Sequence, residues 1–239
     1  MTADNEYPKA SNATLIGASI TYVAGLFLLL SFAGPYWIES YPEMFSSFKH
    51  MGLWEYCFDR FRFPSYQYDK LFHGCHYIFS EEFYVIREWL LPGWLMAVQS
   101  FVTLALILSL ISQVLLACVI VRWPLRTVLR YEWIFVTAAF IMVAVSSVFL
   151  FLAVAIFGGN CYNREWLLYP SFNVLSWSYA FAVVAFMLFG ILRNQGMVTT
   201  RLVDGRAILC HPGFDPVSDI SSIAGLRHCE VAVAHRTEI

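Results

Sequence analysis

The chain has 239 residues, of which 59% are hydrophobic and only 13% are charged. Because soluble domains carry about a quarter of charged residues, this composition excludes an ordinary soluble protein and is typical of an integral membrane protein. The formal net charge is −2, and we expect the lipid bilayer, not nucleic acid, as the surrounding partner.

Four apolar runs are each long enough to cross a bilayer, which takes roughly 20 helical residues. They predict transmembrane helices at residues 13–34, 95–121, 134–157 and 174–192. The first run is longer than the apolar core of a signal peptide, so we expect it to be retained. The four helices form one predicted domain, residues 1–192, followed by a flexible tail, residues 193–239.

The helix interiors contain no Asp, Glu, Lys, Arg or His, and Gln99 and Gln113 are their most polar residues. Proton and ion pathways in membranes usually need buried ionisable groups, so the sequence argues against a pump or a transporter. Gly17, Thr21 and Gly25 repeat every four residues. This stripe of small residues predicts close helix packing inside the bundle, with a dimerisation face as the alternative.

Charged residues set the expected orientation. Arg122, Arg126 and Arg130 lie in the short segment between the second and third helices, which the positive-inside rule places in the cytosol. Both termini are then cytosolic, and the loops at residues 35–94 and 158–173 lie outside the cell.

The large outer loop has strand character. LWEYCFDR, residues 53–60, alternates in period two with one aromatic face, and residues 36–41 and 74–79 are further strand candidates. Cys57 and Cys75 share this oxidising compartment, where a disulfide persists. We therefore expect a small antiparallel sheet with a Cys57–Cys75 disulfide, which contributes roughly 3 kcal/mol in the chain-entropy model.

Trp37 after the first helix, then Gly52-Leu53-Trp54, Cys57 and Cys75, resemble the W…GLW…C…C signature of the claudin superfamily. Helix number, loop lengths and orientation agree with it over residues 13–192. The resemblance implies a left-handed four-transmembrane-helix bundle with a small extracellular antiparallel β-sheet. It also implies that the two cysteines are bonded and that the tryptophans anchor the sheet on the bundle near the membrane surface.

Three features depart from the vertebrate pattern. The segment between Cys57 and Cys75 is longer than in vertebrate claudins, Gln99 stands where that pattern has an arginine, and Cys161 in the second outer loop is atypical. These features resemble a divergent invertebrate member, of the kind that belongs to septate junctions.

Other motifs predict partners rather than catalysis. The terminal Thr237-Glu238-Ile239 fits a class I PDZ ligand. Cys118, a cysteine beside the membrane, is a candidate for palmitoylation, with an ordinary small helix residue as the equal alternative. A metal site at His73, Cys75 and His76 is disfavoured because Cys75 is expected in a disulfide. The adjacent Cys-His pairs in the tail are equally weak candidates for a metal site.

No phosphate loop, nucleophile elbow or HExxH helix occurs in the sequence, so we expect no enzyme, no cofactor and no bound metal. The resemblance implies a plasma-membrane protein of lateral cell–cell junctions, tight or septate, that associates with itself or other claudin-like proteins in cis and in trans and restricts paracellular diffusion. The alternative is an auxiliary γ-type subunit of an ion channel or receptor, and a paracellular pore is a third possibility.

Overall fold

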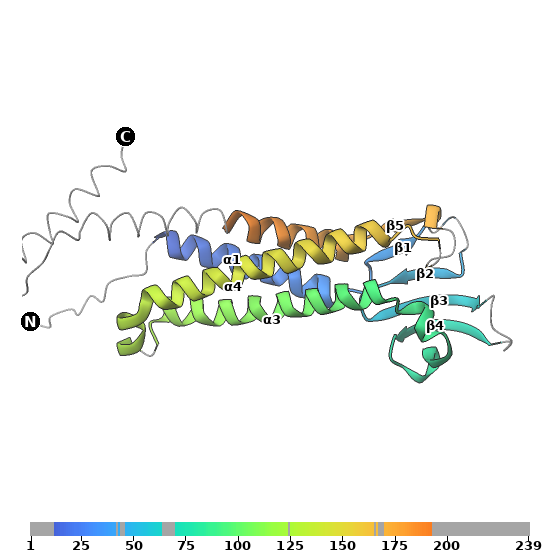
Figure 1. Cartoon of the computed structure of the whole chain (residues 1–239), viewed down its shortest axis with the longest axis horizontal. Coiled ribbons are helices and arrows are strands. Elements are labelled where there is room, and N and C mark those ends of the chain that lie inside the picture. The colour runs from blue at the N-terminus through green and yellow to red at the C-terminus, as the bar shows by residue number, and fades with distance from the viewer. Residues whose placement is uncertain are drawn as a thin grey trace, which may run out of the picture. The chain divides into compact units, whose positions relative to one another are not determined.

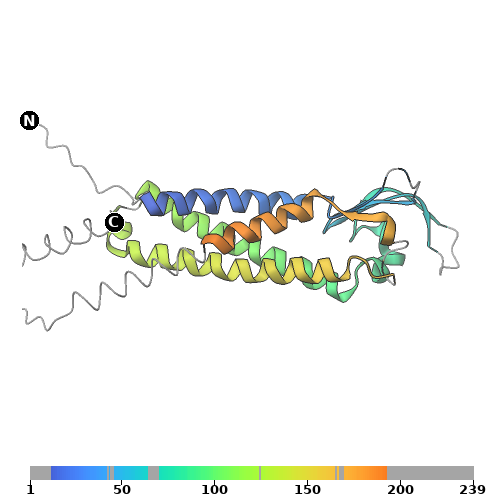
Figure 2. The same ribbon diagram turned by 90° about the horizontal axis from the view of Figure 1, so that it is seen from above.

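The structure is a computed structural model that describes residues 12–41, 43, 46–63, 70–123, 125–164, 166 and 170–192. Its long helices are α1 (Asn12–Ala33), α3 (Gly93–Val121) and α4 (Leu125–Asn160), joined by the helix Trp177–Leu192. These helices run alongside one another, and the strands lie together at one end of them (Figures 1 and 2).

Three of these helices contain stretches long and apolar enough to cross a membrane: Thr14–Ala33, Gly93–Val121 and Tyr131–Asn160. The helix Trp177–Leu192 is also apolar but shorter over its described residues. The bundle is therefore that of a membrane protein, with its helices at positions close to the four apolar runs.

One predicted helix boundary was wrong. The last helix begins at Trp177 instead of residue 174, because Val174 and Leu175 belong to a strand. α4 has non-helical dihedral angles at Tyr131 (φ −122°, ψ 21°), which mark a kink between two helical segments. The apolar stretch that follows, Tyr131–Asn160, contains the third predicted helix, residues 134–157.

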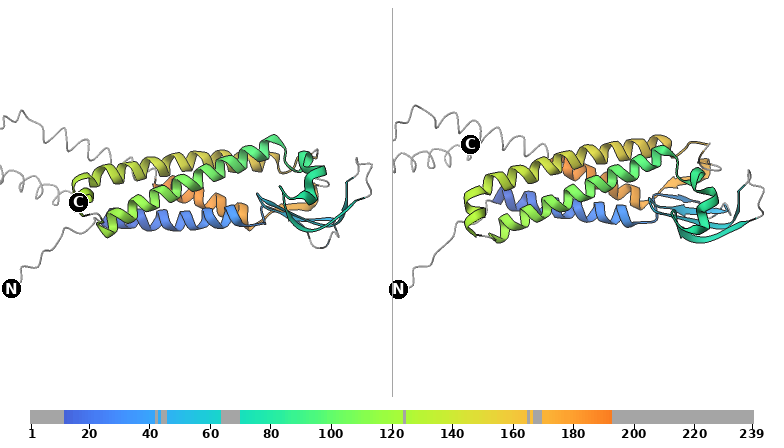
Figure 3. Two further views of the ribbon diagram at one scale, coloured as in Figure 1. Left: turned by 90° about the horizontal axis from the view of Figure 1, so that it is seen from below. Right: turned by 60° about the horizontal axis from the view of Figure 1, so that its bottom comes forward.

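The strands are β1 (Ile38–Ser40), β2 (Phe48–Met51), β3 (Glu55–Arg62), β4 (Leu71–Tyr77) and β5 (Asn173–Leu175). They form one antiparallel sheet in the order β4-β3-β2-β1-β5. A 3₁₀ helix, η2 (Glu81–Ile86), and a short helix, α2 (Arg87–Leu90), connect β4 to α3. Figure 3 shows this sheet beyond the ends of the helices.

The predicted small antiparallel sheet is confirmed, but two of its strands were missed. β2 was missed because Lys49 and His50 interrupt its apolar pattern, and β5 because its three residues adjoin the last apolar run. β5 pairs with β1, with Ile38 opposite Leu175. The two loops that connect the helices on this side therefore form a single sheet.

The expected alternation of β3 breaks at a bulge. Arg60 has a positive φ of 48°, and the pairing with β4 shifts between Phe58 and Phe61. A bulge inserts an extra residue into one strand, so Phe61 returns to the buried face with Tyr56 and Phe58. Arg60, which strict alternation from Tyr56 and Phe58 would place on the same face, is exposed.

Close packing joins α1 to α3. A side chain at Gly25 would collide with the amide of Gln113, and the Tyr22 hydroxyl donates to the Gln113 carbonyl oxygen at 2.8 Å. Gly17, by contrast, has open space around it. The small-residue stripe is thus used for packing inside the bundle at Gly25, as the packing interpretation predicted.

Candidate functional site

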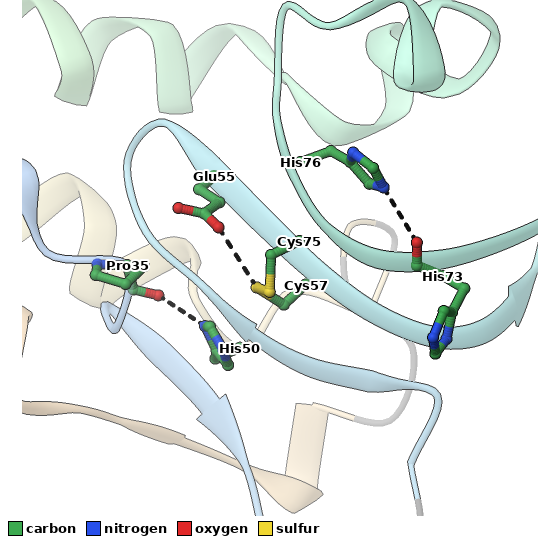
Figure 4. The surroundings of a disulfide bond; sticks show 7 residues. All are labelled: Pro35, His50, Glu55, Cys57, His73, Cys75 and His76. Atoms are coloured by element: carbon green, nitrogen blue, oxygen red, sulfur yellow. Dashed lines mark hydrogen bonds between the residues drawn. A yellow bond between two sulfur atoms is a disulfide. The ribbon is translucent and has the colours of Figure 1, made fainter.

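The region best placed to meet a partner is the sheet with η2 and α2, in which a disulfide joins two strands (Figure 4). Cys57 and Cys75 lie opposite each other on β3 and β4, with their Cα atoms 4.0 Å apart, and their sulfurs are bonded. The predicted disulfide is therefore confirmed. Cys57 is buried, whereas Cys75 is exposed and lies on the edge strand β4.

One face of the sheet is a packed aromatic layer. Phe58 stacks on Phe61 with ring centroids 4.7 Å apart, and Phe83 of η2 meets Phe58 edge-on at 5.8 Å. Phe61 in turn stacks on Trp89 of α2. Such ring pairs contribute about 0.5–1.5 kcal/mol each beyond area burial, so η2 and α2 are held firmly on β3.

The Gly52-Leu53-Trp54 segment is where the sheet attaches to the bundle. Leu53 is fully buried, and its carbonyl oxygen accepts a 2.6 Å hydrogen bond from Nε2 of the buried Gln99 in α3. A Cβ at Gly52 would lie 2.6 Å from the Gly34 oxygen and 2.7 Å from Cα of Pro35. Gly52 is therefore required because two backbone segments approach each other too closely for a side chain.

The two tryptophans of the sequence signature have different surroundings. Trp37 is fully buried, its Nε1 donates to the Ser31 carbonyl at 2.9 Å, and its ring meets Phe157 edge-on at 4.8 Å. Trp54 is half-buried and meets Phe32 at 5.2 Å, and its indole nitrogen has no hydrogen-bond partner among the described residues. Both rings contact the helix ends from which the sheet begins.

A single backbone carbonyl joins the two loops. The Leu90 oxygen accepts hydrogen bonds from the Tyr56 hydroxyl at 2.7 Å and from Nε1 of Trp166 at 3.5 Å. Burial raises the pKa of Tyr56 far above its ordinary value, so the hydroxyl keeps the proton that it donates. β3, α2 and the second loop are therefore locked together by groups that the sequence alone did not connect.

The outward side of the sheet carries a charged cluster centred on Asp59. Its carboxylate lies 3.9 Å from Nζ of Lys49, 3.6 Å from Nε of Arg60 and 3.3 Å from Nδ1 of His73. Exposed ion pairs of this kind contribute at most about 1 kcal/mol each. The ion pairs around Asp59 therefore contribute little to the stability of the fold, and their charged groups remain accessible to a partner.

The face of η2 and α2 that points away from the sheet is also accessible. Tyr84 is 73% exposed, and its ring lies 5.5 Å from the guanidinium carbon of Arg87. The exposed residues recur at helical spacing, and they are Glu81, Tyr84, Val85 and Glu88.

The histidines predicted as weak metal candidates are used otherwise. His73 faces Asp59, and Nε2 of His76 lies 3.1 Å from the His73 carbonyl oxygen. The histidine beside the disulfide is instead His50 of β2, which lies opposite Cys57. Sequence reasoning missed it because β2 itself was missed.

The remaining predicted residues lie away from the sheet or outside the described residues. Cys161, after α4, is buried and its thiol approaches the Gly158 carbonyl at 3.2 Å. Cys118 in α3 is half-buried, and neither cysteine is in a disulfide among the described residues. At that end of α3, Arg122 pairs with Glu132 at 2.7 Å. Thr237, Glu238 and Ile239 lie outside the described residues.

Comparison with known proteins gives one family. The family model described as PMP-22/EMP/MP20/Claudin tight junction matches residues 22–191, which is more than half of the chain. The matched range includes all five strands and the disulfide. A comparison with curated proteins gave no match.

Proposed function

The chain belongs to the PMP-22/EMP/MP20/claudin family, and from this premise we propose that it is a structural protein of cell–cell junctions that restricts paracellular diffusion. Neighbouring copies, or copies of other claudin-like proteins, associate within one membrane and across the intercellular space. We assign it no catalytic activity.

The observation that carries this proposal is the single sheet made from both loops. Five strands form one sheet, and the disulfide joins two of them. Gln99 connects the sheet to α3, and the Leu90 carbonyl connects it to the second loop. A preorganised surface loses little conformational freedom on binding. Such a surface suits repeated contacts between identical molecules better than a loop that must order on each encounter.

The proposed orientation places the sheet outside the cell. The arginines at positions 122, 126 and 130 follow α3 at the opposite end of that helix from the sheet, and positive residues favour the cytosolic side. The disulfide agrees with an extracellular sheet, because disulfides persist in oxidising compartments.

The chain termini would then be cytosolic, and we propose two further contacts on that side of the membrane. We propose that Thr237-Glu238-Ile239 binds a PDZ scaffold, which recognises a hydroxyl two residues before an apolar carboxyl terminus. Cys118, near the cytosolic end of α3, is a proposed palmitoylation site. Septate rather than tight junctions are the proposed location within the family.

The test is expression in a polarised epithelial line that lacks the endogenous protein. We expect the tagged chain at lateral borders, with raised transepithelial resistance and reduced flux of an uncharged tracer. The charge-reversed variant Asp59→Lys, which changes only the exposed cluster, should reach the same borders and alter the permeability to cations relative to anions. Diffuse surface localisation with unchanged resistance would contradict the junction role.

Co-purification distinguishes the auxiliary-subunit alternative. Material extracted in mild detergent should contain other claudin-like chains or junction scaffolds. Stoichiometric recovery of channel or receptor subunits, with no effect on resistance, would instead favour a γ-type role.

A further inference from the structure

We propose that the disulfide covers a latent zinc site, formed by Cys57, Cys75 and His50, which becomes available when the disulfide is reduced. The sheet would then have a second way to connect its strands. This inference concerns the chemistry of the sheet and does not depend on the junction role.

The three residues come from three adjacent strands. His50 of β2 lies opposite Cys57 of β3, which lies opposite Cys75 of β4. One potential ligand atom from each residue lies within 4.8 Å of the other two. Zinc binds thiolate at about 2.3 Å and imidazole at about 2.0 Å. The ligand atoms of a tetrahedral site are therefore somewhat less than 4.8 Å from one another. Small side-chain rotations would therefore complete the site.

The hydrogen bond of His50 prepares its ring for a metal. Nδ1 lies 3.1 Å from the Pro35 carbonyl oxygen, and the dashed line between these residues in Figure 4 marks this contact. Because a carbonyl only accepts, this contact places a proton on Nδ1, and Nε2 is then the nitrogen that a metal would bind in the neutral ring. Histidines that bind zinc usually donate their other N–H to a carbonyl or a carboxylate in this way. The stacked ring of Tyr36, 4.2 Å away, restricts the rotation of the imidazole further.

A carboxylate oxygen lies close to one sulfur of this group, and a change of side-chain rotamer would be needed for it to act as a fourth ligand. Oε1 of Glu55 lies 3.8 Å from Sγ of Cys57, and these residues are two positions apart in β3, on one side of the strand. A carboxylate is an ordinary zinc ligand, and a water molecule can take the same position in an open site. The donor set would be two thiolates, one imidazole and one oxygen.

The chemistry balances with a dithiol reductant. The reductant supplies two electrons and becomes a disulfide, the Cys57–Cys75 bond breaks, and each sulfur takes up one proton. Zn²⁺ then displaces these two protons and binds the two thiolates. The exposure of Cys75 on an edge strand gives the reductant access to the bond.

The test uses the full-length chain with Cys118, Cys161, Cys210 and Cys229 changed to serine, so that no other thiol binds zinc. The protein is purified in detergent, reduced with a phosphine and freed of it, then titrated with Zn²⁺ against a chromophoric chelator. We expect one more ion for each reduced chain than for each oxidised chain. Replacement by Co²⁺ should give a thiolate-to-cobalt charge-transfer band.

Two histidine variants test whether His50 itself binds the zinc ion. His50→Gln should weaken zinc binding by at least about tenfold and change the cobalt spectrum. The matched control is His76→Gln, which alters a histidine next to Cys75 in sequence but outside the ligand group. Its affinity should equal that of the parent chain.

Either of two titration results would overturn the proposal: no additional ion in the reduced chain, or an affinity in the His50→Gln variant equal to that of the parent chain. Near-ultraviolet circular dichroism follows the sheet during the titration. A reduced sheet that unfolds and does not recover when Zn²⁺ is added also counts against the site.

Discussion

The side-chain amide of Gln99 donates a 2.6 Å hydrogen bond to the carbonyl oxygen of Leu53, and both residues are buried. This bond connects α3 directly to the turn between β2 and β3. Replacing Gln99 by alanine would leave a buried carbonyl unpaired, which costs about 1–3 kcal/mol. We expect Gln99→Ala to lower the free energy of unfolding by that amount in detergent denaturation.

The control for Gln99 is the next residue in α3. Ser100 is exposed and its hydroxyl donates only to the Met96 carbonyl in its own helix, so Ser100→Ala should change stability by less than about 0.5 kcal/mol. Equal stability of the two variants would show that the bond to Leu53 is not what holds the segment.

Gly52 provides a steric test of the same attachment. A methyl group there meets the backbone of Gly34 and Pro35, which cannot move aside as a side chain can. We expect Gly52→Ala to destabilise the protein by about 1–3 kcal/mol and to reduce its surface expression. Gly93→Ala is the matched substitution, because nothing lies within 4 Å of a Cβ at that position. Similar surface levels for the two variants would refute the close approach.

Cys161 should react slowly with alkylating reagents in the folded protein. Burial raises the pKa of its thiol, so the folded chain holds the proton at pH values where the unfolded chain has begun to lose it. The resulting stabilisation is complete below the ordinary cysteine pKa of about 8.5 and declines as the pH rises above it. Alkylation followed by peptide mass spectrometry should therefore label Cys161 faster as pH increases.

The same peptide maps, prepared without reduction, should contain the Cys57–Cys75 pair. Fast labelling of Cys161 at neutral pH in the native protein would contradict its burial.

Cys57→Ser or Cys75→Ser should lower surface expression more than Cys118→Ser, because only the first two remove the bond between β3 and β4.

Deletion of Thr237-Glu238-Ile239 should mislocalise the protein without unfolding it. A short peptide that orders on binding makes few contacts, so we expect a dissociation constant in the micromolar range. This corresponds to a binding free energy of about −8 kcal/mol. Fluorescence polarisation with a peptide ending in RTEI and a panel of PDZ domains measures this, with Thr237→Ala as the control peptide. Absence of binding in a panel where known ligands bind would refute the contact.

The membrane helices and the disulfide could be predicted because their signals are local. Long apolar runs indicate bilayer helices without reference to tertiary structure, and two cysteines in one outer loop suggest a pair. The position of His50 could not be predicted, because it depends on the register of β2, which has two polar residues among its four. The shift at Arg60 likewise depends on a positive φ that sequence alternation does not reveal.

The attachment of the sheet was predictable only in part. The Gly52-Leu53-Trp54 signature indicated where it occurs, and Gln99 was singled out as a departure from the family pattern. The bond between Gln99 and Leu53 depends on the approach of segments distant in sequence, as does the shared Leu90 carbonyl. Residue patterns identify such participants, but only tertiary packing assigns their partners.

The pairing of β1 with β5 sets an order of events during synthesis. β1 follows the first helix and β5 precedes the last, so β1 has a free edge until nearly the whole bundle has emerged from the ribosome. The Cys57–Cys75 bond needs only the first loop and can form much earlier. Contacts between distant segments form late because they must wait for chain closure. A chain truncated after α4 would therefore carry a bonded β3–β4 pair together with an unprotected edge at β1, which exposes it to pairing with other chains.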